Sequence, residues 1–152
     1  MPVPAPLKAL LLALSLPPGL LAAQEAAPAG DAAAGEAVFD RQCVACHVVQ
    51  APGGEVLAGR SARAGPNLHG VVGRAPGSHP GYAYSDAMEA FGATGAAWAE
   101  ASLVPYVQDP TGFLRDALGD PRARGKMAYK VQGEEDARNV AAFLATFPAA
   151  AG

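Results

Sequence analysis

The sequence has 152 residues and a formal net charge of −3, which suits one domain of ordinary size and excludes a strongly basic nucleic-acid binder. Its two cysteines exclude a small protein held together by several disulfides. Hydrophobic residues make up 51% of the chain, but 36 of the 152 residues are alanine. From residue 24 onward, only 22 of 129 residues are Leu, Val, Ile or Phe, a fraction typical of disordered chains, although the charge is low. Either this part of the chain is loose, or a group other than its side chains fills its core.

The amino end is typical of an export signal. Lys8 precedes an apolar stretch that is roughly half as long as the ~20 residues needed to span a bilayer. A Pro-Pro-Gly break and small residues follow, which predict cleavage near Ala23. An uncleaved anchor and a disordered leader are the alternatives. The expected organisation is a signal peptide over 1–23, a flexible lead-in over 24–30, a domain over 31–148 and a tail over 149–152.

A first helix is predicted directly after the lead-in. Asp31 is a favoured N-cap residue, and Gly35, Phe39, Cys43 and Cys46 then recur on one helical face. Because Gly35 has no side chain, a second helix can approach this face closely.

A last helix is predicted near the other end of the chain. Acidic residues at 134–136 suit a first helical turn, where the helix dipole favours negative charge. An apolar face follows, formed by Val140, Phe143, Leu144 and Phe147. We expect the two terminal helices to cross, with Phe39 against the face that carries Phe143.

Shorter helices are predicted between them. Ser85 can cap a helix that ends at Gly92. Asp109 can cap another, which has Pro110 at its first position and ends at Gly119.

The segment 98–109 is also predicted to be helical, although Pro105 deletes one backbone hydrogen bond if it lies inside a helix. A regular helix that starts near Ser102 would place Pro105 in its first turn and avoid this loss. Residues 50–80 and 120–125 are rich in Gly, Pro and Arg and are expected to be loops. These elements predict an all-α domain with long loops.

The run Cys43-Val44-Ala45-Cys46-His47 has the C-x-x-C-H pattern of c-type haem attachment. Two thiols at this spacing can reach the two vinyl groups of one porphyrin, and the adjacent imidazole then lies under the iron as an axial ligand. A redox disulfide would need a βαβ pattern that this sequence lacks, and a zinc site would need further ligands, whereas His69 and His79 are isolated. A covalent haem would also supply the missing apolar core.

The second axial ligand is predicted to be Met127. This methionine lies in an irregular segment rich in Arg and Lys, where core packing does not explain it, and a thioether raises the reduction potential. Met88 lies in a short amphipathic helix, where a methionine is usually core packing. His69, His79 and an open coordination position are the remaining alternatives.

The chain resembles the class I cytochrome c family, most closely its bacterial cytochrome c2 type, over residues 30–148. The resemblance rests on the order of several pieces along the chain: 43–48, 64–74 (AGPNLHGVVGR), 84–88 (YSDAM), Trp98, 106–110 (YVQDP) and 125–127 (GKM). It implies two crossing terminal helices, with short helices and long loops wrapped around one covalent haem c per chain.

The resemblance also implies roles for residues around the haem. The Pro66 carbonyl would accept a hydrogen bond from His47 and so fix its ring. Arg74, Tyr84 and Trp98 would hydrogen-bond the inner haem propionate, a buried anion that is costly without partners.

Two further tyrosines have implied positions, Tyr106 beside the Met127 sulfur and Tyr129 near the exposed haem edge. The sequence departs from the mitochondrial members of the family, which surround this edge with lysines, because only Lys126 and Lys130 remain here.

A docking surface is expected around the proposed ligand Met127. Basic residues outnumber acidic ones between positions 120 and 130, where Asp120 is opposed by Arg122, Arg124, Lys126 and Lys130. Such charges can orient a carrier toward an acidic partner. A merely solvated loop is the alternative explanation.

The resemblance implies a soluble periplasmic one-electron carrier, not an enzyme, that is monomeric and has no membrane span in its mature form. Its donor would be a quinol-oxidising cytochrome bc complex, and its acceptor a photosynthetic reaction centre or a terminal oxidase. A peroxidase-like haem enzyme would need an open distal position with a His/Arg pair. An anchored cytochrome module would need a retained leader. A gas-binding four-helix cytochrome carries its C-x-x-C-H near the carboxyl end and is therefore disfavoured.

Overall fold

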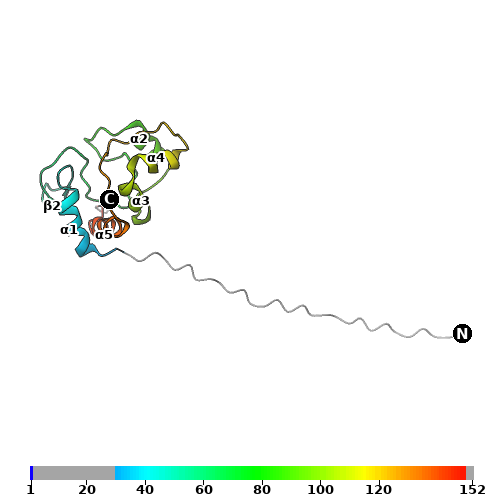
Figure 1. Ribbon diagram of the computed structural model, residues 1–152, viewed down its shortest axis with the longest axis horizontal. Helices are drawn as coiled ribbons and strands as arrows, with labels where there is room; N and C mark the ends of the chain where they lie inside the picture. Colours follow the sequence, from blue (N-terminus) through cyan, green and yellow to red (C-terminus); the bar gives the residue numbers. More distant parts are fainter. Residues whose placement is uncertain (2–29, 150–152) are drawn as a thin grey trace.

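The computed structural model describes Met1 and residues 30–149, and helices dominate this part of the chain (Figure 1). The elements are α1 (Ala32–Gln42), β1 (Val48–Gln50), β2 (Val56–Gly59), α2 (Asp86–Ala93), α3 (Glu100–Gln108), α4 (Pro110–Leu118) and α5 (Glu134–Ala145). The predicted fold class is confirmed, with one small sheet added. Apart from Met1 and Gly30, the predicted signal peptide and lead-in lie outside the described residues, as do residues 150–152 of the tail.

The terminal helices α1 and α5 lie against each other (Figure 1). Asp31 caps α1, because its carboxylate accepts from the backbone N–H groups of the first turn. The rings of Phe39 and Phe143 have centroids 5.5 Å apart, so the predicted contact is confirmed. At Gly35 an added Cβ would overlap the Asn139 carbonyl oxygen, which shows how closely the two backbones approach.

The predicted caps of α2 and α4 are also present. The Ser85 hydroxyl accepts from a backbone N–H in the first turn of α2, and this helix ends one residue beyond Gly92. The Asp109 carboxylate caps α4, which has Pro110 at its start and the left-handed Gly119 (φ 62°) at its end. These local signals are sufficient because each cap bonds within its own turn.

Helix α3 lies within the segment 98–109 that was predicted to be helical. It begins at Glu100, so Pro105 lies inside the helix and not in its first turn. The Ser102 hydroxyl accepts from the backbone N–H of Ala99, which closes the first turn of the helix. Pro105 is exposed, so the carbonyl that loses its partner can face water and the proline is tolerated.

The expected loop over residues 50–80 contains strand β2. It pairs antiparallel with β1, and Val48 lies opposite Gly59 and Val49 opposite Ala58, before the register shifts beyond Val49. Val49 is fully buried, while Val56 and Leu57 at the far side of the hairpin are exposed. The alternation is too short to predict a strand from periodicity, and the pairing depends on the turn between the strands.

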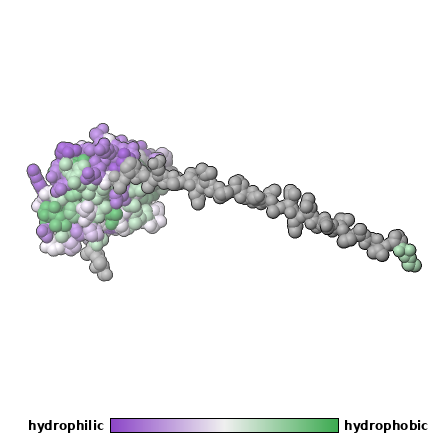
Figure 2. All heavy atoms as spheres, turned by 90° about the horizontal axis from the view of Figure 1, so that it is seen from below, coloured by the Kyte–Doolittle hydropathy of each residue, from purple (hydrophilic) through white to green (hydrophobic). Residues whose placement is uncertain are grey.

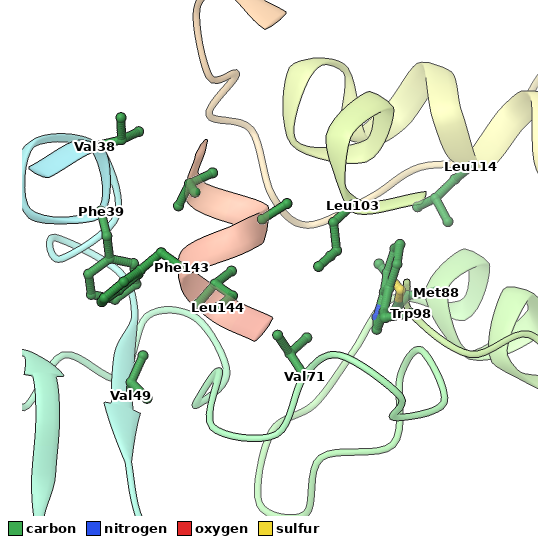
Figure 3. Packing of buried hydrophobic residues seen from close by; sticks show 12 residues of the cluster. Val38, Phe39, Val49, Val71, Met88, Trp98, Leu103, Leu114, Phe143 and Leu144 are labelled. Carbon is green, nitrogen blue, oxygen red and sulfur yellow. The ribbon is translucent and has the colours of Figure 1, made fainter. Parts of the chain in front are cut away.

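The buried side chains form one hydrophobic cluster, which Figure 3 shows from close by. Phe39 and Phe143 lie together beside α5, whereas Trp98 and Met88 lie together with Leu114 close by. Met88 is 6% exposed and contributes to the core, as its helical position predicts. None of the helices in the described residues is long and apolar enough to cross a membrane.

Candidate functional site

The Cys43–His47 run forms a turn directly after α1. The helix ends at Gln42 with Cys43 as its C-cap, and the backbone N–H groups of Cys46 and His47 both donate to the Cys43 carbonyl, at 3.0 and 2.9 Å. Cys46 therefore lies beyond the helix and not on its face, which corrects the prediction. The five residues of this turn therefore carry two thiols and one imidazole, and both thiols are free.

The His47 ring is held on two sides. Its Nδ1 lies 2.9 Å from the Pro66 carbonyl oxygen, and since a carbonyl only accepts, Nδ1 carries the hydrogen and Nε2 keeps its lone pair. An added Cβ at Gly65 would lie 2.6 Å from Nδ1, so only glycine allows this close approach. Burial lowers the pKa of His47, and the hydrogen bond to the Pro66 carbonyl opposes this shift. The lowered pKa favours the neutral ring that a metal requires.

The surroundings of Cys43 do not favour redox or zinc chemistry at this turn. Burial, followed by the nearby Cys46, raises the pKa of Cys43 to about 11, so this thiol is protonated at neutral pH. Redox thiols have lowered pKa values instead. Within residues 30–149, no three or more His, Cys, Asp or Glu side chains gather as metal ligands.

The segment 120–133, which we call the Met127 segment, is irregular and connects α4 to α5. Hydrogen bonds fasten it to the helices before it: Arg115 Nε donates to the Ala123 carbonyl (3.2 Å), Gly125 N–H to Thr111 Oγ1 (3.4 Å), and Val131 N–H to the Val107 carbonyl (2.8 Å). The segment is thus held in place by its backbone on both sides of Met127.

The four alternative ligand residues differ in their surroundings. Met88 is committed to the core, whereas Met127 is only half-buried. His69 and His79 both lie in the loop between β2 and α2, and burial lowers the pKa of His79.

Arg74 and Trp98 lie side by side through their backbones. The Trp98 N–H donates to the Arg74 carbonyl at 2.9 Å. The Arg74 guanidinium donates to the carbonyl oxygens of His69 (2.8 Å) and Asn67 (3.1 Å). Burial lowers the pKa of Arg74, and the nearby Tyr84 opposes this shift. A desolvated guanidinium beside a phenol is a suitable partner for a buried anion.

An aromatic cluster surrounds Trp98. Its ring centroid lies 4.8 Å from that of Tyr106 and 5.6 Å from that of Phe91. Phe113 is 5.7 Å from Tyr106 in an edge-on arrangement, and burial raises the pKa of Tyr106. Phe91 and Phe113 were not predicted as residues of this cluster, although their positions on the inner faces of α2 and α4 were an available signal.

Tyr129 and Lys126 connect the Met127 segment to other elements. Tyr129 is 49% exposed and its hydroxyl donates to Gln42 Oε1 at 3.1 Å. Lys126 Nζ donates to the Ala83 carbonyl and lies 5.8 Å from the centre of the Tyr82 ring. Gln42 and Tyr82 were not predicted, because their partners are distant in sequence.

The predicted docking charges are partly compensated. Lys130 Nζ lies 2.9 Å from Asp109 Oδ1, and Arg122 Nε lies 3.8 Å from Asp120 Oδ1. Asp109 precedes α4 and lies outside the segment, so it was not included in the predicted charge. It lowers the local excess of positive charge from +3 to +2. On the face of the molecule shown in Figure 2, hydrophilic and hydrophobic side chains gather in separate areas.

The residues present fit a covalent haem. One turn carries two free thiols and a fixed, neutral imidazole, and a methionine lies in an anchored segment of the same helical domain. The fold and this site define a protein of the c-type haem-attaching class.

Comparisons with known proteins agree. A family model for cytochrome c matches residues 32–148. The chain is 54% identical over 117 residues to cytochrome c2 of Rhodovulum adriaticum, covering 77% of this chain and 92% of that protein. It is 50% identical over 128 residues to cytochrome c2 of Fuscovulum blasticum, covering 82% and 80%. The solved structure of cytochrome c2 from Rhodobacter sphaeroides matches with a TM-score of 0.75 and 46% identity, covering 78% of this chain and 97% of that one.

The chain therefore belongs to the cytochrome c family, and the resemblance stated from its sequence is confirmed. Its relatives named cytochrome c2 are electron carriers and not enzymes, so the peroxidase-like alternative is set aside. The cofactor of the family is a covalently bound c-type haem, for which Cys43 and Cys46 have the required spacing.

Proposed function

We propose that this chain is a periplasmic one-electron carrier whose haem iron is bound by His47 and Met127. The observation that carries the proposal is the His47 ring, which follows the second cysteine and is fixed by Pro66 with Nε2 left available. Bound haem supplies a couple between ferrous and ferric iron in which one electron is gained or lost.

The protein's own residues keep the ligands in place during this exchange. The Pro66 carbonyl holds the hydrogen on His47 Nδ1, which fixes the ring's orientation and strengthens Nε2 as a donor. Gly65 leaves room for the ring. Because the Gly65 N–H donates to the Cys46 carbonyl at 2.7 Å, this loop is fastened to the attachment turn, and little has to rearrange when the charge at the site changes.

Met127 supplies the second ligand in this proposal. A thioether is a weak, neutral donor and favours the reduced state, which suits a carrier of high potential. The backbone bonds of Gly125 and Val131 on either side of Met127 support this role, because they fix the segment without burying the side chain in the core.

The setting and partners follow from the export signal and the relatives. We propose that the leader is cleaved near Ala23 and that the mature protein acts as a monomer. The donor would be a quinol-oxidising cytochrome bc complex and the acceptor a photosynthetic reaction centre or a terminal oxidase. The bacterial relatives named cytochrome c2 support this assignment.

An optical spectrum with a redox titration tests the ligand assignment. The ferric protein should show the weak band near the red end of the spectrum that reports a thioether on iron. Met127→Ala should abolish this band, lower the potential and let added cyanide bind readily. Met88→Leu is the matched control, because it exchanges one core side chain for another of similar volume. Loss of the band in Met88→Leu but not in Met127→Ala would overturn the assignment.

A further inference from the structure

The side chain of Gln42, the last residue of α1, joins three parts of the molecule. Its Nε2 donates to Asp136 Oδ2 in the first turn of α5, at 2.9 Å. Its Oε1 accepts from the Tyr129 hydroxyl, at 3.1 Å. One amide therefore uses its donor toward α5 and its acceptor toward the Met127 segment.

The positions of these residues give the amide a specific place. Gln42 directly precedes Cys43, the first residue of the attachment turn, and Tyr129 is two residues beyond Met127. The amide thus connects the attachment turn to the segment that carries the proposed ligand.

The orientation of Gln42 is set by Asp136. This carboxylate lies in the first turn of α5, where the helix dipole favours a negative charge, and it is half-buried. With Nε2 directed to the carboxylate, Oε1 faces the other way and meets the phenol. α1 and α5 are themselves packed closely, so the amide is presented to Tyr129 from a rigid support.

Tyr129 depends on this bond more than a buried residue would. Its side chain is 49% exposed, so packing restricts it little. The backbone bonds of Gly125 and Val131 hold the segment toward α3 and α4. The bond to Gln42 holds it on the side of α1.

We propose that Gln42 is a positioning residue that keeps the Met127 segment closed over the attachment turn and so opposes displacement of Met127 from iron. This rests on the proposed His47/Met127 ligation. Breaking one neutral hydrogen bond should favour opening about 2- to 10-fold, which corresponds to about 0.4–1.4 kcal/mol.

The test measures the affinity of the ferric holoprotein for imidazole, followed optically as imidazole replaces the methionine. Gln42→Leu removes both hydrogen bonds and Tyr129→Phe removes only the bond to the segment. Both should bind imidazole about 2- to 10-fold more tightly than the parent. Arg41→Leu is the matched control, because Arg41 also lies 3.6 Å from Asp136 but belongs to no hydrogen bond with Tyr129 in the part of the chain that the structure describes.

The double variant separates positioning from general destabilisation. If Gln42 acts through Tyr129, then Gln42→Leu with Tyr129→Phe should bind imidazole no more tightly than Gln42→Leu alone, because both changes break the same bond. Additive effects would overturn the proposal. So would affinities for Gln42→Leu and Tyr129→Phe that equal that of Arg41→Leu.

Met127→Ala distinguishes a failure of the role proposed for Gln42 from a failure of the proposed ligation by Met127. If this variant binds imidazole much more tightly than the parent while Gln42→Leu does not, the role of Gln42 is wrong and the ligation stands. If Met127→Ala leaves the affinity unchanged, the ligation is wrong and the role of Gln42 falls with it.

Discussion

The α1–α5 helix pair and the Met127 segment are held in place by different forces. In the helix pair, Val38, Phe39 and Val140 are at most 2% exposed, and the backbones meet at Gly35. In the segment 120–133, only Ala123 and Val131 are buried. The helix pair is stabilised by burial of apolar side chains, each worth about 1.5–3 kcal/mol, whereas the segment relies on hydrogen bonds worth about 1 kcal/mol each and on exposed ion pairs that contribute little.

This difference in stabilisation agrees with the structural role of each region. A helix pair with close packing has one arrangement and supports the attachment turn that follows α1. In the proposed ligation, a segment fastened by a few polar bonds would carry Met127, and its bond to iron would supply the rest of its stability.

The largest expected effect comes from removing the haem. Cys43→Ala with Cys46→Ala should give a protein without native helix content, because the apolar side chains are too few to form the core alone. Circular dichroism and a thermal scan provide the measurement. A well-folded haem-free protein would show that the helix pair and its neighbours suffice without the cofactor.

The second effect tests the helix pair directly. Gly35→Ala should lower the free energy of unfolding by about 3 kcal/mol, because the new Cβ overlaps the Asn139 carbonyl and the helices must separate. Urea unfolding measures the change. Gly53→Ala is the control, since an added Cβ there meets nothing within 4 Å and its stability should be nearly that of the parent. Equal stability of the two variants would contradict the close contact.

The third prediction concerns the loss at low pH of the ion pair between Lys130 in the Met127 segment and Asp109 at the start of α4. Lys130, and next the Gly112 N–H, lower the pKa of the Asp109 carboxyl. A lowered folded pKa means that its contribution is complete above the unfolded pKa and is lost as the pH falls through the folded one. Asp109→Asn keeps a capping oxygen but loses the partner of Lys130. The difference in Tm between parent and variant should therefore be largest near neutral pH and shrink below about pH 4. A difference that is constant from pH 7 to pH 3 would contradict this.

The elements that could be predicted are those whose signals are local. Asp31, Ser85 and Asp109 bond within their own turns, and the contact between Phe39 and Phe143 follows from two helical periodicities. The run of cysteines and histidine identifies its cofactor because five consecutive residues carry the whole chemistry of attachment.

The features that could not be predicted depend on partners distant in sequence. The bond between Gln42 and Tyr129 joins residues 87 positions apart, and no local pattern marks it. The ion pair of Lys130 with Asp109 likewise requires the chain to fold back along α4. Whether Pro105 lies in the first turn of α3 or inside the helix could not be predicted locally, because the proline is tolerated inside the helix through its exposure.

The fourth prediction concerns the surface of the Met127 segment. Arg122→Glu with Lys126→Glu should slow second-order electron transfer to a photosynthetic reaction centre, one of the two proposed acceptors, at low salt, with little change in potential. Charges at the edge of a contact act mainly on the association rate. The deficit should shrink toward ~1 M salt, where the screening length is ~3 Å.

The smallest effect separates compensated from uncompensated charges within this surface. Lys130 lies 2.9 Å from Asp109, so its field at a distance is partly cancelled, whereas Arg124 takes part in none of the ion pairs among residues 30–149. Arg124→Gln should therefore slow the low-salt reaction more than Lys130→Gln, although both remove one positive charge from the same segment. The reaction with a small neutral oxidant is the control and should be the same in both variants, because no charged surface has to be oriented. Equal slowing by the two variants would show that the partner senses only the net charge of the segment, and that the pairing with Asp109 has no effect on docking.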